Sequence, residues 1–223
     1  MFNLLFLNTV LPDWATDKVS LISIISIALI VIVLLLISIF YKKAPTKKLA
    51  LMALCIATSF TLSFIKVKLS LYGGSITLLS MLPLIFFAYT YGFSYGLMAG
   101  FIYGILQFIE SPYILTVATF SLDYILPFSS VMIAPIFKKF IKNKAISFSL
   151  GVVAVYILRI SFHILSGMIF YEFGYVYDGF PQGSAFIYSF VYNISYLLPD
   201  MILAVIGSIF LAKSKIDERL KLV

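Results

Sequence analysis

The sequence predicts an all-α polytopic membrane protein. Of its 223 residues, 62% are hydrophobic and only 11% are charged, and the mean hydropathy is +1.10. Soluble domains carry about a quarter charged residues. The first long apolar stretch, LISIISIALIVIVLLLISIF, is apolar on every side, whereas the strands of a transmembrane barrel alternate apolar and polar positions. Spanning helices are therefore expected.

Several stretches approach the length of about 20 apolar residues that a helix needs to cross a bilayer. They lie at 19–41, 47–66, 75–91, 93–110, 114–137, 146–171 and 184–212. The first has no basic segment directly before it and no cleavage site, and the basic segment YKKAPTKK follows it. We interpret it as an extra N-terminal transmembrane helix rather than a signal peptide.

Three parts of the chain follow from these stretches. They are the extra helix with its basic linker at 1–45, a six-helix membrane domain at 46–215, and a charged cytoplasmic tail at 216–223. The single cysteine, Cys55, lies inside a predicted span, so no disulfide framework or thiolate metal cluster is expected within one chain.

The distribution of lysine predicts the orientation. When the gaps between stretches are assigned alternately to two sides, one side has only Lys18, Lys66 and Lys68. The other side has Lys42, Lys43, Lys47, Lys48, Lys138, Lys139, Lys142, Lys144, Lys213, Lys215, Arg219 and Lys221. Lysine-rich loops face the cytoplasm, so we expect the N-terminus outside and the C-terminus inside. The net charge of +7 then reflects topology and attraction to lipid, not nucleic-acid binding.

Three polar side chains share one depth in the outer half of the predicted bundle. At 1.5 Å per residue, Asp123 lies roughly 14 Å below the outer end of its stretch, and His163 and Asn193 lie roughly 12 Å below theirs. An ionisable group in a span costs a few kcal/mol and usually faces the interior, with a partner or a function. These three residues are candidates for a binding site.

Tyrosines gather around that level. They are Tyr113, Tyr124, Tyr171, Tyr188 and Tyr192. A tyrosine offers a ring face and a hydroxyl, which suits an aromatic or cationic ligand. The pattern predicts a pocket that is open to the outside, lined by rings and anionic at one point. A purely structural role for Asp123, as a hydrogen-bond partner, is the alternative.

Arg159 has two possible partners. It lies one helical turn from His163, and either Asp200 or Asp123 could pair with it. A pair with Asp200 would be structural, whereas a pair with Asp123 would occupy the proposed anchor of the ligand. The sequence leaves both open. Glu110, by contrast, is predicted to lie in a solvated loop.

Small residues predict two surfaces of close helix packing. Ala50, Ala53 and Ala57 are spaced i, i+3 and i+7 and form a stripe that would let another helix approach, although alanine is common enough for chance to produce it. In GFSYGLMAGFIYGI, four glycines are spaced by four residues, which favours a second packing face within the bundle.

Four segments, taken in order along the chain, carry a resemblance to a known family. They are YGGSITLLSMLPLIFFAYTYGFSYGLMAGFIYGIL, SPYILTVATFSLDYILPF, ILRISFHILSGMIFY and IYSFVYNISYLLP. Together they resemble the thiamine-specific substrate-binding component (S component) of energy-coupling factor transporters, over about residues 48–212. The resemblance implies a six-helix S-component core in a bacterial plasma membrane, with an outward-facing thiamine site.

The resemblance also assigns site residues. The motif LDY places Asp123 and Tyr124 at the ligand, and the motif H-x-x-x-G falls on His163 and Gly167. The family's aromatic and polar positions fall on Tyr113, Tyr171, Tyr188 and Asn193. The implied partners are thiamine, a transmembrane coupling subunit, which would dock on Ala50, Ala53 and Ala57, and ATPase subunits.

Two other functions compete with a binding subunit. A solitary carrier would use a proton gradient, with His163, Arg159 and Asp200 as relay. An intramembrane enzyme would use His163 as base and Ser166 or Ser189 as nucleophile, but no strained Gly-x-Ser-x-Gly turn is present. The sequence also has no phosphate-binding Gly-rich loop ending in Lys-Ser/Thr and no metal-ligand cluster. We expect no enzymatic activity and no cofactor.

Overall fold

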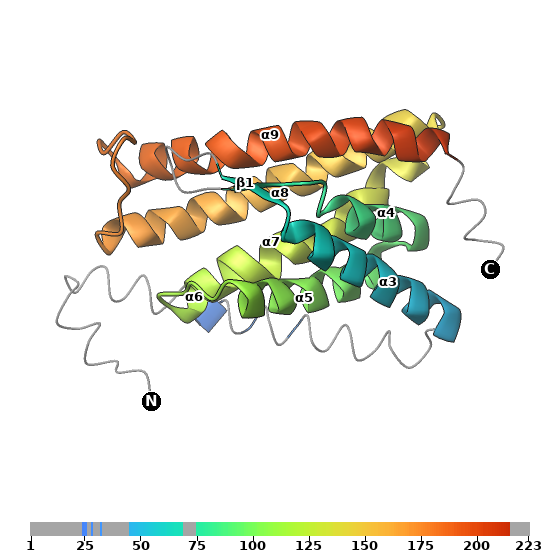
Figure 1. Ribbon diagram of the computed structural model, residues 1–223, viewed down its shortest axis with the longest axis horizontal. Coiled ribbons are helices and arrows are strands. Elements are labelled where there is room, and N and C mark those ends of the chain that lie inside the picture. The colour runs from blue at the N-terminus through green and yellow to red at the C-terminus, as the bar shows by residue number, and fades with distance from the viewer. Residues whose placement is uncertain (1–23, 26–27, 29–31, 33–44, 69–74, 215–223) are drawn as a thin grey trace.

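The computed structural model describes residues 45–68 and 75–214, together with four isolated positions at 24, 25, 28 and 32 (Figure 1). The predicted extra helix at 19–41 and the predicted tail at 216–223 lie outside these continuous ranges. The loop at 69–74 also lies outside them.

Helices dominate the described chain, which confirms the predicted fold class. The unbroken helices are α3 (Thr46–Ser63), α4 (Leu82–Tyr91), α5 (Phe93–Glu110), α8 (Lys144–Glu172) and α9 (Ala185–Lys213). A sixth, broken helix runs through α6 (Val117–Phe120), the π turn η1 (Ser121–Ile125), α7 (Leu126–Ser129) and the 3₁₀ segment η2 (Ser130–Lys139). Four of these segments are long and apolar enough to cross a membrane: Phe93–Glu110, Val117–Lys139, Lys144–Glu172 and Ala185–Lys213.

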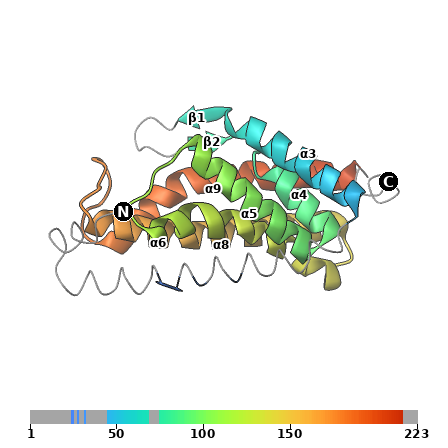
Figure 2. The same cartoon turned by 90° about the horizontal axis from the view of Figure 1, so that it is seen from below.

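The bundle is elongated, and α8 and α9 run side by side along its long axis (Figure 1). On the other side of α8 lie α5 and the broken helix, while α3 crosses near one end. Seen from below, α3 and the two short strands occupy one edge of the bundle (Figure 2). The helices thus form a single packed body around one principal core, which contains Phe87, Tyr103 and Tyr156.

The stretch predicted to span at 75–91 does not form one long helix. Its first residues form the strand β2 (Ser75–Thr77), which pairs antiparallel with β1 (Lys66–Lys68). Helix α4 then begins at Leu82, with Pro83 in its first turn, where proline is well tolerated. At 10 residues, α4 is about half the length of a spanning helix. The predicted helix 47–66 also ends earlier, at Ser63, because residues 66–68 enter this hairpin.

The glycines of α5 form the packing face that their spacing predicts. A Cβ added at Gly100 would lie 2.2 Å from the carbonyl oxygen of Phe128, and one at Gly104 would lie 2.3 Å from that of Tyr124. No larger residue fits at these positions without moving backbone. Close contact with α5 therefore holds the broken helix in place at the turn that carries Asp123.

Candidate binding site

The helix that carries Asp123 is interrupted at that residue. Over Ser121–Ile125 the backbone widens into a π turn, in which the Leu126 N–H donates to the Ser121 carbonyl. Pro127 contributes to the break, because it has no N–H to close an α-helical bond on the carbonyl of Asp123. Such π turns are frequent at functional sites. The stretch predicted to span at 114–137 thus corresponds to the candidate span Val117–Lys139, but it changes its helical form along its length.

The position of Asp123 also differs from the prediction. Its helical segment begins at Val117, six residues before Asp123, which corresponds to roughly 9 Å rather than 14 Å. Thr116 caps this beginning, since its hydroxyl accepts from the Thr119 N–H and the Thr119 hydroxyl accepts from the Thr116 N–H. Residues 111–115, between α5 and Thr116, are thus loop and not helix.

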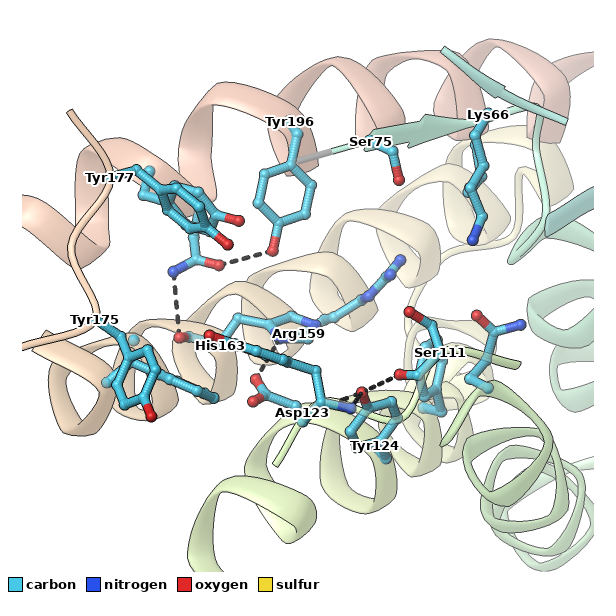
Figure 3. A pocket seen from close by; sticks show the side chains of 18 of the residues that line it. Lys66, Ser75, Ser111, Asp123, Tyr124, Arg159, His163, Tyr175, Tyr177 and Tyr196 are labelled. Atoms are coloured by element: carbon cyan, nitrogen blue, oxygen red, sulfur yellow. Dashed lines mark hydrogen bonds and ion pairs between the residues drawn. The ribbon is translucent and has the colours of Figure 1, made fainter. Parts of the chain in front are cut away.

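A cavity of about 320 Å³ opens beside Asp123 (Figure 3), a volume at the lower end of small-molecule sites. It lies between the hairpin, the end of α5, the π turn, the helices α8 and α9, and the loop that joins these two helices. Its lining is Lys66, Ser75, Thr77, Gln107, Glu110, Ser111, Tyr113, Asp123, Tyr124, Phe128, Arg159, His163, Gly167, Phe170, Tyr175, Tyr177, Tyr188, Tyr192, Asn193 and Tyr196.

Asp123 meets α8 at two points. One carboxylate oxygen lies 3.0 Å from Nδ1 of His163, and the other accepts from the Ser166 hydroxyl at 2.6 Å. Nε2 of His163 is buried and has no hydrogen-bond partner among the described residues. A neutral imidazole with its proton on Nδ1 donates to Asp123 and leaves Nε2 as an uncharged acceptor, which costs less when buried than the charged N–H of an imidazolium would.

Tyrosine rings form the wall opposite Asp123. The rings of Tyr188 and Tyr192 are nearly parallel, with centroids 6.2 Å apart, and Tyr177 stacks on Tyr192 at 5.6 Å. The hydroxyl of Tyr188 accepts from the Tyr177 N–H at 3.0 Å. This bond fastens the loop after α8 to α9 and keeps the stack in place.

Two predicted residues hold the loop that precedes the broken helix. The hydroxyl of Tyr124 donates to the Ser111 carbonyl at 2.5 Å and accepts from the Tyr113 N–H at 3.0 Å. The ring of Tyr113 stacks on Phe170 of α8, at 5.0 Å between centroids. Both tyrosines line the cavity, and Tyr124 also holds the backbone of Ser111 and Tyr113 beside it.

Asn193 lines the cavity with its amide already engaged. Its Nδ2 donates to the carbonyl oxygens of Ser189 at 2.8 Å and His163 at 3.2 Å, and its Oδ1 accepts from the Tyr196 hydroxyl at 2.8 Å. Close approach of the helices makes this possible: a Cβ on Gly167 would lie 2.2 Å from the Ser189 hydroxyl. Asn193 thus joins α8 to α9 behind the site.

Tyr171 is the predicted site residue that the structure leaves off the cavity wall. Its hydroxyl donates to the carbonyl of Gln182, and its ring packs on Tyr188 at 5.3 Å. It supports a wall residue from behind instead of lining the cavity.

Two charged pairs border the cavity. Arg159 Nη1 lies 3.5 Å from Asp200, whose same oxygen accepts from the Tyr156 hydroxyl at 2.8 Å. The structure therefore pairs Arg159 with Asp200 and not with Asp123. Lys66 Nζ lies 2.6 Å from Glu110, so the prediction of a merely solvated Glu110 is wrong. The two residues belong to separate loops in the predicted arrangement, and the hairpin brings them together.

Comparison with known proteins identifies the family. Residues 49–219 match the family described as thiamine transporter protein. The chain belongs to this thiamine transporter family. It is 30% identical over 150 residues to the thiamine transporter ThiT of Bacillus subtilis (strain 168), covering 60% of this chain and 72% of that protein. A solved structure of ThiT from Listeria monocytogenes has the same fold, with a TM-score of 0.64, 24% identity, and coverage of 78% of this chain and 96% of that one.

Membership of the thiamine transporter family makes the chain a multi-pass membrane transporter rather than an enzyme. The contacts of its serines are consistent with this. Ser166 donates to Asp123, and Ser189 donates to the Ile164 carbonyl, so neither hydroxyl is bonded to the imidazole of His163. No group of three potential metal ligands occurs among the described residues.

Proposed function

We propose that this chain is the high-affinity thiamine-binding subunit of an energy-coupling factor transporter, energised by a separate ATPase module. The observation that carries the proposal is the cavity itself, in which the carboxylate of Asp123 faces stacked tyrosine rings (Figure 3). Thiamine has a permanently cationic thiazolium, an aminopyrimidine and a hydroxyl. Rings and a carboxylate favour the cation, and hydrogen-bonding side chains suit the other two groups.

Each wall then has a role toward thiamine. Asp123 would accept from the amino group or attract the thiazolium, with His163 and Ser166 fixing its two oxygens. Tyr113, Tyr124 and Tyr188 would supply ring faces, and Tyr113 and Tyr188 would also supply hydroxyls, since that of Tyr124 is engaged with the loop before the broken helix. Asn193 would act mostly through Tyr196, since its amide is already engaged, and Tyr171 would hold Tyr188 in place.

Energy would come from other subunits. The sequence has no Gly-rich loop of the ATP-binding type, and the small-residue stripe of α3 is a candidate docking face for a coupling subunit. Ala50, Ala53 and Ala57 are all exposed on the described chain. A stripe of this kind lets a partner helix approach closely.

The cavity would open to the outside of a bacterial plasma membrane. It lies at the end of the bundle where α5 and α8 finish, near Glu110 and Tyr175. The opposite end carries Lys139, the last residue of η2, and Lys142, which lies between η2 and α8. Lysine-rich ends face the cytoplasm, which supports the proposal that the N-terminus lies outside and the C-terminus inside.

Two measurements test the proposal. Calorimetry with the purified full-length protein in detergent should detect tight thiamine binding without any partner. Uptake into liposomes should require the coupling and ATPase subunits together with ATP. Uptake by this chain alone, driven by a proton gradient, would instead establish a solitary carrier, with Arg159 and Asp200 as candidate relay groups.

A further inference from the structure

Four formally charged side chains line the cavity along the described chain, besides His163. Two are cationic, Lys66 on β1 and Arg159 on α8, and two are anionic, Glu110 at the end of α5 and Asp123 on the π turn. Each cation has its own carboxylate: Lys66 lies 2.6 Å from Glu110, and Arg159 lies 3.5 Å from Asp200. Among the residues that the structure describes, Asp123 has no such cation, since its partners are Ser166 and the imidazole of His163.

The carboxylate of Asp123 therefore supplies the net charge of the cavity. This balance depends on the pairing of Lys66, whose ammonium group the hairpin brings to the wall. The side chains of Lys66 and Glu110 are 27% and 13% exposed, so solvent and salt screen their charges less than they screen charges on an open surface. An unpaired ammonium here would act on any ligand bound beside Asp123.

We propose that Glu110 is a specificity-determining residue, which cancels the charge of Lys66 so that Asp123 can select an organic cation. The inference rests on the proposed function, because it takes thiamine as that cation. Without Glu110, the ammonium of Lys66 would oppose the thiazolium and favour anionic ligands. Glu110 need not touch the ligand for this effect, since charges interact over several ångströms at low effective dielectric.

A structural latch is the competing explanation. The same ion pair joins the hairpin to α5, next to a second link in which Gln107 donates to the Ser63 hydroxyl at 2.9 Å. Loosening this junction would impair binding whichever partner is replaced. Charge balance predicts changes in thiamine affinity of opposite sign. Removing Lys66 and removing Glu110 break the same contact, yet they change the charge of the cavity in opposite directions.

The experiment compares four full-length proteins in detergent at low salt: wild type, Glu110→Gln, Lys66→Met and the double variant. Their ligands are thiamine and a deaza analogue, in which carbon replaces the thiazolium nitrogen and the ring is uncharged. Glu110→Gln should bind thiamine roughly tenfold more weakly, as expected for a unit charge about 10 Å away at an effective dielectric of about 20. Lys66→Met should bind thiamine at least as tightly as wild type, and the double variant should return close to wild type.

The uncharged analogue should bind all four proteins with similar affinity. Weaker thiamine binding by Lys66→Met, or an equal loss for the analogue in Glu110→Gln, would overturn the charge role and establish the latch. Should Glu110→Gln fail to fold, the direction of the Lys66→Met effect still decides. If wild type does not bind thiamine, the proposed function is refuted, and this inference with it. If wild type binds thiamine tightly but Lys66→Met and Glu110→Gln both weaken that binding, this inference alone is refuted.

Discussion

Replacing Asp123 by Asn tests the anchor of the site. The change keeps the shape of the side chain and removes its charge. One of its oxygens becomes an NH₂ group, which cannot accept, so either the Ser166 hydroxyl or the His163 N–H loses its acceptor. A hydrogen bond to a charged group contributes about 1.5–3 kcal/mol. The affinity for thiamine should therefore fall by about 10- to 100-fold.

The control for this substitution is Ser166→Ala. It removes the 2.6 Å hydrogen bond to Asp123 but keeps the carboxylate charged, so we expect a loss of only a few-fold. Calorimetry measures both affinities, and thermal unfolding in detergent verifies that both variants are folded. Unchanged affinity in folded Asp123→Asn would remove Asp123 from the site and leave it a structural partner of α8. Equal losses in both variants would show that its position, not its charge, matters.

Three further substitutions test other parts of the structure. Asp200→Asn removes the carboxylate beside Arg159 and should lower the free energy of unfolding by about 2 kcal/mol, or roughly 5 °C in Tm. Uptake should stay independent of a proton gradient. Lost uptake in a variant of full stability with intact binding would favour the proton relay. Gly167→Ala places a methyl group 2.2 Å from the Ser189 hydroxyl and should weaken thiamine binding. The control Gly183→Ala should not, because a Cβ at that position has no atom within 4 Å. Equal affinities of the two variants would contradict the tight contact of α8 and α9. Ala53→Trp should keep thiamine binding in detergent but lose ATP-dependent uptake and co-purification with the coupling subunit. The control Ser161→Trp, on the exposed side of α8, should retain all three properties. Normal uptake by Ala53→Trp would mean that the docking face lies elsewhere.

The similar depths of His163 and Asn193 could be predicted because helices advance by a constant rise per residue, and both lie on regular helices. The count for Asp123 was too deep, because residues 114–116 form a loop and its helical segment begins only at Val117. Asp123 nevertheless meets His163, as the shared level had indicated. The same regularity explains why Tyr171 lies off the wall. It follows His163 by eight residues, and at about 100° per residue it points about 80° away from that side chain.

Contacts made by irregular backbone could not be predicted in this way. Lys66 and Glu110 meet because β1 pairs with β2 in one register, with Lys66 opposite Thr77, and no helical period encodes that pairing. Tyr175 and Tyr177 reach the cavity from a loop, so their depth cannot be counted from a helix end. The ten-residue α4 was hidden because the strand and the helix together form one continuous apolar stretch.

The π turn at Asp123 makes the site sensitive to the number of residues in the chain. The π turn holds one residue more than an α-helical turn, so deleting one residue between Ser121 and Ile125 would close it and leave the segments before and after it in nearly their present orientation. The part after it is fixed, because Gly100 of α5 fits closely against the backbone of Phe128. The side chains within the turn would change direction instead, and the carboxylate of Asp123 would lose its alignment with His163 and Ser166. A relative that lacks the extra residue should thus keep the bundle but not this alignment.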